Sequence, residues 1–497
     1  MCSKDACPPP PALWHTRDQE EMTAVDQGAG NSAAKRWASL LVPGIVSLLT
    51  AGLATAGASS LPVTFNRDVL PILQRNCQSC HRPGEVAPMS FLTYESTRPW
   101  AKAIKVAVLT RKMPPWPADP RFGQFLHDRT LNPEDMATLT SWVDSGAPEG
   151  DAKDKPPEKR WPTGWNIPPD AVVSLPEPIS IPAKGTVELT EIRVPTGFTK
   201  DTWINSIEIQ PGNRSVVHHV VVCIVPHSDD AENGVARAPK QRRDGEGIAI
   251  KKIQRDDRLR SPTGVDAIYV PGAPLVDYRL HHAAKLIPAG SDLLIQLHYT
   301  PNGVATTDQT RIGFTFAKDE PARRFITVNP TALRDRAHFR IPAGDPNWET
   351  RTELVFNEDA EIVWFMPHMH LRGKDMTYRL VYPNGESRTL LSVKFNFQWQ
   401  MSYDVAEPIV VPKGTKLEVV AHFDNSANNR FNPDPNADVW WGDQTWEEMM
   451  VAWLGVVVDK DKELPKVVSY TPEFSECSPG GGKRETKLCR EAGILLR

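Results

Sequence analysis

Short apolar runs, interrupted by proline, glycine and polar residues, make up most of the chain after residue 170. Clear examples are Trp203–Ile209, Val216–Val225, Leu293–Tyr299 and Val451–Val458, which are rich in β-branched residues. Runs of this length, without helical periods between them, are typical of antiparallel β-sandwiches. Because a region of about 300 residues is too long for one sandwich, we expect two.

The pattern before residue 151 is different and partly helical. Asn132–Gly146 places Met136, Leu139 and Trp142 on one face, which predicts an amphipathic helix. The charged, proline-rich segment that follows has no periodicity and is expected to be a linker. The predicted organisation is a leader (1–58), a small α-helical domain (59–151), the linker (152–170), two sandwiches (171–320 and 321–474) and a tail (475–497). The predicted fold class is therefore mainly β.

The leader contains an uncharged apolar stretch, Trp37–Ala58, directly after Lys35 and Arg36. A basic pair, an apolar run and small residues at its end predict a secretory signal that is cleaved after Ala58. Initiation at Met22 would remove the long polar segment that precedes the pair. The alternative is an uncleaved anchor, because the run reaches the roughly 20 residues that span a bilayer. We expect a periplasmic or secreted protein, with a possible membrane tether.

Composition narrows the function classes. The 497 residues include 57 Lys and Arg and 61 Asp and Glu, which gives a net charge of -4. A nucleic-acid binder usually has an excess of basic residues, so this composition argues against nucleic-acid binding. The 46 prolines argue against a mainly helical body, because proline breaks helix interiors. The seven cysteines do not form a disulfide framework, and only Cys477 and Cys489 are left as a candidate pair.

Cys77-Gln78-Ser79-Cys80-His81 is the Cys-x-x-Cys-His signature of covalently attached c-type haem. Two thiols add to the two haem vinyl groups, and the adjacent histidine is then held beneath the iron. A redox-active Cys-x-x-Cys motif would instead lie in an alternating strand and helix pattern, which is absent here. The stretch from residue 64 to residue 151 resembles a small cytochrome c domain.

The second axial ligand of such a haem is expected to be a thioether or another histidine. The candidates in this region are Met89, Met113, His127 and Met136. We favour Met113, because the prolines that follow it stiffen an extended loop suited to presenting its sulfur atom.

The 13 histidines are unevenly distributed, and ten of them lie at or after His218. His368 and His370 are two residues apart, which places them on the same face of a strand and indicates a metal site. Adjacent residues such as His218 and His219 point to opposite faces, so both can bind one metal only if the strand is bulged there. His298 projects from an otherwise apolar strand.

Taken in order, four motifs resemble the copper type II, ascorbate-dependent monooxygenases, which include peptidylglycine α-hydroxylating and dopamine β-monooxygenases. The motifs are Val217-His218-His219-Val220, Gln296-Leu297-His298-Tyr299, His368-Met369-His370-Leu371 and Glu447-Glu448-Met449. The resemblance covers residues 176–458 and is more specific than any single motif.

The resemblance implies two copper ions on two jelly-roll-like sandwiches. His218, His219 and His298 would hold an electron-storing copper. His368, His370 and Met449 would hold a copper that activates dioxygen, and a thioether favours Cu(I). Three alternatives stay open: Met450 could replace Met449, the pair His281-His282 could displace His298, and His338 and His422 are further candidate ligands. The disulfides of the animal enzymes are absent, and the residues that select their substrates cannot be aligned.

The sequence therefore predicts an exported copper-dependent monooxygenase that hydroxylates a small organic substrate with dioxygen. Its reductant would be its own haem, ascorbate or a cytochrome chain, with a possible external electron donor. One rival is a copper nitrite reductase, which needs a Cys/His/Met site, but Cys223 and His227 have no methionine shortly after them. Another is a non-enzymatic haem and copper protein for electron transfer or copper binding.

Overall fold

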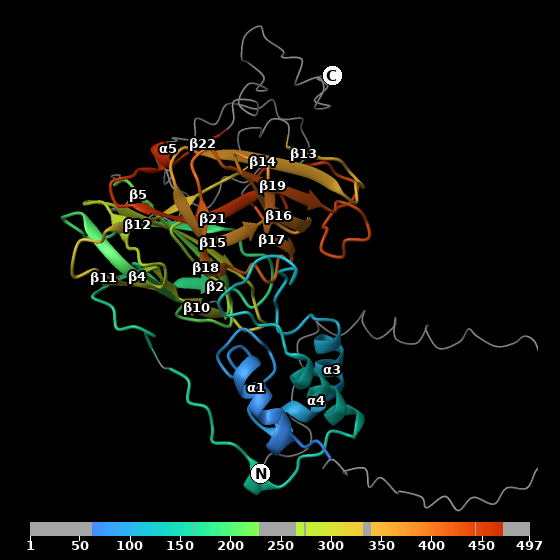
Figure 1. The fold of residues 1–497 in the computed structure, drawn as a ribbon. Coiled ribbons are helices and arrows are strands. Elements are labelled where there is room, and N and C mark those ends of the chain that lie inside the picture. The colour runs from blue at the N-terminus through green and yellow to red at the C-terminus, as the bar shows by residue number, and fades with distance from the viewer. Residues whose placement is uncertain are drawn as a thin grey trace, which may run out of the picture. The chain divides into compact units, whose positions relative to one another are not determined.

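Antiparallel strands form most of the regular secondary structure of this protein, which we describe from a computed structural model (Figure 1). The structure describes residues 62–162, 164–227, 265–272, 275–331, 339–442 and 444–470. The chain divides into two units, residues 1–62 and residues 63–497. The mainly β prediction is confirmed. The predicted leader, the candidate pair Cys477 and Cys489, and His338 lie outside the described residues.

Most helices of the second unit lie near its beginning, where they enclose a hydrophobic cluster of their own. They are a π-helical turn (Phe65–Val69), α1 (Leu70–Asn76), α2 (Tyr94–Thr97), α3 (Ala101–Leu109) and α4 (Pro133–Asp144). The predicted amphipathic helix is confirmed, because α4 buries Leu139 and Trp142 completely. Its first turn is capped by Asn132, whose side chain accepts a hydrogen bond from the Asp135 backbone N–H.

The first set of strands follows the predicted linker and forms two main sheets. One sheet has the order β1-β11-β4-β7, with β8 also paired to β4, and the other has the order β3-β9-β5-β6. The strands are β1 (Ala171–Ser174), β3 (Thr190–Pro195), β4 (Thr202–Gln210), β5 (Val217–Val225), β6 (Ala267–Tyr269), β7 (Val276–Asp277), β8 (Lys285–Ile287), β9 (Asp292–Tyr299) and β11 (Arg311–Phe316). A short pair joins β2 (Ile179–Ile181) to β10 (Thr306–Asp308).

The second set also forms two main sheets, in the orders β12-β21-β15-β18 and β17-β16-β19-β14-β22. The strands are β12 (Arg323–Val328), β14 (Trp348–Phe356), β15 (Ala360–His368), β16 (Gly373–Val381), β17 (Ser387–Lys394), β18 (Tyr403–Val411), β19 (Lys416–Phe423), β21 (Val451–Asp459) and β22 (Val468–Tyr470). A short pair joins β13 (Arg340–Ile341) to β20 (Val439–Trp440), and α5 (Leu464–Val467) precedes β22.

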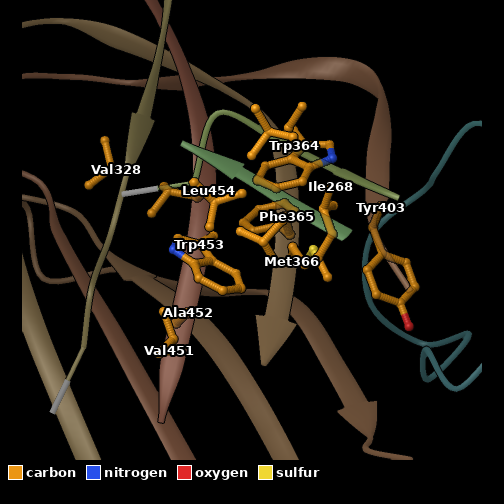
Figure 2. Close-up of a cluster of buried hydrophobic side chains, with 14 of the residues drawn as sticks. Ile268, Val328, Trp364, Phe365, Met366, Tyr403, Val451, Ala452, Trp453 and Leu454 are labelled. Carbon is orange, nitrogen blue, oxygen red and sulfur yellow. The ribbon is translucent and has the colours of Figure 1, made fainter. Parts of the chain in front are cut away.

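One continuous hydrophobic core runs through both sets of sheets. Figure 2 shows part of it, where Ile268 of β6 lies near Met366 of β15. Phe365 and Leu454 are fully buried partners on the neighbouring strands β15 and β21. This shared core explains how the strands can be held without disulfides, because burying large apolar side chains is the dominant favourable term in folding.

Residues 116–126 form a strap that closes one side of the second set of sheets. At one end, Ala118 bridges Val393 of β17, and at the other end Phe125 bridges Val405 of β18. The backbone N–H of Asp119 donates to Ser392 over 2.8 Å, and that of Leu126 donates to Asp404 over 2.8 Å. The strap therefore pairs with the outermost strand of each sheet, although the sequence places it within the helical region.

Aromatic side chains hold this strap in place. Trp116 and Phe125 pack edge-on against Tyr403, with ring centroids 5.0 and 5.4 Å away. Gly123 approaches so closely that a Cβ there would lie 2.6 Å from the carbonyl oxygen of Leu390. Only glycine fits this position.

Among the described residues, no helix has the length and apolar character needed to cross a bilayer.

Candidate metal centre

Strand β5 has the bulge that metal binding by both His218 and His219 would require. Strands β5 and β9 pair regularly from Val225 to His219, and the register shifts between His219 and Val217. The irregularity lets His218 and His219 turn toward each other, and their Nδ1 atoms lie 2.9 Å apart. Two nitrogens that bind one metal at about 2.0–2.1 Å lie about 2.9 Å apart when they meet at a right angle.

The register of the two strands brings His298 to the same place. His298 of β9 is the direct partner of His219 of β5. Their rings stack, with centroids 4.1 Å apart and planes inclined by 22°. The first three predicted ligands therefore form one group, although about 80 residues separate them in the sequence.

The second histidine pair lies at the end of β15. His368 is the last residue of the strand and pairs with Val451 of β21, and the ring of His370 lies 5.3 Å from that of His368. Both rings are oriented through Nδ1. His368 contacts the side-chain oxygen of Gln400, and His370 lies 3.1 Å from the backbone carbonyl of Glu447. Histidines that bind metals are commonly oriented in this way, by a hydrogen bond at the ring nitrogen that does not bind the metal.

The two groups of histidines are neighbours. The ring centroids of His219 and His368 are 6.4 Å apart. Phe397 links the groups, because it stacks on His218 at 5.2 Å and meets His370 edge-on at 6.4 Å. All five histidines that the sequence analysis assigned to metal sites are thus gathered in one region of the structure.

Burial keeps these imidazoles neutral. His219, His368 and His370 expose only 2%, 6% and 2% of their surface. Loss of solvent lowers the pKa of His218 and His370 to about 4 and that of His368 to about 3. The pKa of His219 is lowered well below its usual value by burial and by the neighbouring imidazoles. Neutral imidazole is the form that binds metal ions.

Two residues of the segment Glu447-Glu448-Met449 contact His370: Glu447 through its backbone carbonyl and Glu448 through its side chain. The Glu448 carboxylate is fully buried and accepts hydrogen bonds from the backbone N–H groups of His370 (2.9 Å) and Arg372 (2.6 Å). Burial raises the pKa of Glu448 to about 8. Met449 is half-buried at the edge of the core, whereas the side chain of Met450 is completely buried.

The donor atoms are not arranged as a finished coordination sphere. Within the described part of the chain, no three side chains of His, Cys, Asp or Glu form a group that could hold a metal ion. The stacked rings of His219 and His298 explain this at the first group, because parallel rings do not direct their nitrogens at a common point. The side chains of His219 and His298 would have to rotate before their ring nitrogens could point at one metal ion.

The haem signature forms a tight turn after α1. The backbone N–H groups of Cys80 and His81 both donate to the carbonyl of Cys77, over 3.1 and 3.0 Å. The His81 ring stacks on Phe91 at 4.2 Å, and its buried Nδ1 has no hydrogen-bond partner. Burial lowers the pKa of His81 to about 4. The ring is therefore a neutral, oriented imidazole with unused hydrogen-bonding capacity.

The candidates for the second axial ligand have different surroundings. Met89 and Met136 pack against the helical cluster. Met113 is half-buried after α3, where its backbone N–H donates to the Ala107 carbonyl, and it immediately precedes the strap. The exposed His127 has a left-handed backbone with φ 59°.

The other histidines considered above form separate contacts. His281 lies against Phe325 and 3.4 Å from Asp404, and His282 is exposed. His422 contacts Asp375 and Glu349, and His227 contacts Asp292. Cys223 is a half-buried cysteine in β5.

Sequence reasoning missed Gln400 and Phe397, which touch the histidines directly. Both lie between β17 and β18, in a stretch without strand or helix periodicity. No signal in a single sequence marks them.

No family model and no curated protein matches this chain. Solved structures titled "Structure of infectious bursal disease virus Gx strain" and "Crystal structure of the T13 IBDV viral particle reveals a missing link in icosahedral viruses evolution" are similar at 9% and 11% identity. They cover 62% and 61% of this chain and 76% and 75% of their own, with TM-scores of 0.15 and 0.16. At these TM-scores the likeness carries no argument about fold or function.

Proposed function

We propose that this chain is an exported copper-dependent monooxygenase with two copper sites and its own c-type haem. One observation supports the proposal most: five histidines from distant parts of the sequence gather at one place, and they are the five that the resemblance selects. In the reaction, one dioxygen, two electrons and two protons convert a C–H bond of an organic substrate to C–OH and release water.

The donor set fits copper. Imidazole suits both oxidation states of the metal, and the thioether of Met449 suits Cu(I). Bound copper would supply one-electron redox chemistry and the activation of dioxygen. His218, His219 and His298 would hold one ion, and His368, His370 and Met449 the other. The pairing of His219 with His298 supports the first set.

The chain's own residues orient and shield these donors. Gln400 and the Glu447 carbonyl fix the ring orientation of His368 and His370. Glu448 holds the backbone between His370 and Arg372. The low exposure of the histidines would keep bulk water from reactive species, a role that enzymes commonly give to buried sites.

The overall architecture belongs to the same proposal. The helical segment would be a small cytochrome c domain, with haem held by Cys77, Cys80, His81 and Met113. The two sets of sheets would be two jelly-roll-like sandwiches, each carrying one copper. Export would place the chain in the periplasm or outside the cell, where covalent haem attachment takes place.

A second function, electron transfer or copper binding without catalysis, is favoured by the same burial. His219, His368 and His370 are nearly inaccessible, which leaves little room for an organic substrate beside them. Oxygen consumption separates the two functions. A monooxygenase couples oxygen uptake to hydroxylation of a substrate, whereas a carrier is reoxidised without product.

Metal analysis of the purified protein tests the proposal first. The monooxygenase requires two copper ions and one haem iron per chain. His370→Ala should remove one copper and abolish oxidation, and the haem spectrum should stay unchanged. His282→Ala is a matched control, because His282 is exposed and lies outside the histidine group. A chain that binds haem but no copper would contradict the proposal.

A further inference from the structure

Three contacts join the region before the linker to the first set of sheets, and one of them involves the haem-attachment segment, Cys77–His81. The Sγ of Cys80 lies beside Gly272. The guanidinium of Arg129 donates to the Gly272 carbonyl. Arg214, in the turn before β5, lies 3.3 Å from Glu85, which also pairs with Arg82 at 2.6 Å.

Gly272 is adapted to this contact. Its φ of 79° is in the left-handed region that favours glycine. A Cβ at this position would lie 2.9 Å from Nη1 of Arg129 and 3.1 Å from Sγ of Cys80. A methyl group here would displace the Arg129 guanidinium and press on the Cys80 sulfur, and the positive φ would strain the backbone of any other residue.

A cavity of about 230 Å³ lies beside the same contact. Ser79, from within the haem signature, lines one wall, and Tyr269 and Gly272 line another. The cavity therefore lies between Ser79 of the motif and the end of β6. Tyr269 is largely withdrawn from water there, which raises the pKa of its hydroxyl above the usual range.

Strand β6 connects this cavity to the histidines. Tyr269 is paired with Val220 of β5, and His219 is the next residue along that strand. Paired residues of antiparallel strands lie about 5 Å apart, and successive residues about 3.4 Å apart. The route from the Cys80 sulfur therefore crosses one non-bonded contact to Gly272, follows the backbone to Tyr269, and crosses the pairing of β6 with β5 to reach His219.

We infer that the contact of Cys80 with Gly272, just after β6, is the electron entry point of the three-histidine site. This inference rests on the proposed function. The contact would carry one electron from a ferrous c-haem, which becomes ferric, to a cupric ion held by His218, His219 and His298, which becomes cuprous. No bond is made or broken, and no proton moves.

The test uses the full chain loaded with haem and copper. The haem is reduced by a flash-generated one-electron donor without oxygen, and its reoxidation is followed together with the loss of the Cu(II) EPR signal. The variants are Gly272→Ala, which adds a methyl group at the contact, and Arg129→Gln, which removes a hydrogen bond without adding bulk. Gly290→Ala is the matched control, since Gly290 also has a positive φ (68°) but nothing near its Cβ position.

We expect both contact variants to slow the transfer by on the order of tenfold, because small displacements at a reacting contact have large kinetic effects. The control should match the unaltered protein. Dipolar EPR coupling between ferric haem and Cu(II) should weaken in Gly272→Ala, a readout that does not depend on turnover. Unchanged transfer in both contact variants would overturn the entry point alone. No transfer in the unaltered protein would overturn the haem relay in the proposed function as well.

Discussion

The Nδ1 atoms of His218 and His219 lie 2.9 Å apart, although the two residues are neighbours in one strand. A regular strand would send these side chains to opposite faces. The shift in register between Val217 and His219 removes that conflict, and the pairing of His219 with His298 adds the third imidazole. The group therefore depends on one local irregularity in β5.

Removal of a single imidazole from this group should release one copper. We expect His219→Ala to bind one copper per chain instead of two, because two remaining histidines hold the ion weakly. Elemental analysis after gel filtration measures the ratio of copper to haem iron. His281→Ala offers a buried histidine outside the group as the control. Loss of both coppers would show that the sites are not independent.

Gln400 orients His368, so its loss should weaken the second copper site. We expect Gln400→Leu to lower the copper affinity of that site about 10–100-fold, the usual effect of removing the group that fixes a ligating ring. Competition with a copper chelator measures the affinity. Gln398→Leu, two residues away in the same segment, should have no effect. Equal affinities in the two variants would contradict the role of Gln400.

Glu448 should be important for stability. Glu448→Ala leaves the buried backbone N–H groups of His370 and Arg372 without their acceptor. Each unsatisfied group costs about 1–3 kcal/mol, so the free energy of unfolding should fall by about 2–6 kcal/mol. Denaturant unfolding of the copper-free protein measures this loss. Glu448→Gln keeps one acceptor oxygen and should lose less, and equal losses would argue against the hydrogen bonds as the cause.

The copper-free protein should lose stability in mild acid. His368 and His370 have pKa values of about 3 and 4 when folded, below the value of about 6.5 in an unfolded chain. The unfolded state therefore binds protons first as the pH falls, and the stability present above pH 6.5 is lost on the way to pH 4. Each histidine should lower the free energy of unfolding by up to about 2 kcal/mol between about pH 8 and pH 5.

Denaturant titrations of the chelator-treated protein at several pH values give this dependence. His370→Gln should flatten the curve, and His282→Gln, at an exposed position, should not. A copper-free protein with the same stability across the range would contradict the neutral, buried state of the histidines.

The strands were predictable because their signal is local. The apolar run Leu293–Tyr299 corresponds to all but one residue of β9, and Val451–Val458 to all but one residue of β21. The sequence indicated the bulge in β5 only as a requirement for His218 and His219 to bind one metal. Whether a strand contains an extra residue depends on its pairing with the neighbouring strand, which the sequence does not specify. The contacts of Gln400 and Phe397 with the histidines arise from tertiary packing alone.

The strap of residues 116–126 was not predictable for a similar reason. Its residues alternate too little to indicate a strand, and its partners Val393 and Val405 lie more than 250 residues later. Pairing with the margins of two sheets becomes possible only after those sheets exist. The sequence placed this segment in the helical domain, whereas its backbone hydrogen bonds go to β17 and β18.

This strap also limits how the chain can be shortened. Without residues 116–126, β17 and β18 would each present a row of open N–H and C=O groups on the same side of the molecule. Such margins recruit strands from other molecules and lead to aggregation. A fragment that begins after the linker would therefore be expected to self-associate. In the full chain, the strap prevents this by covering the exposed edges of β17 and β18.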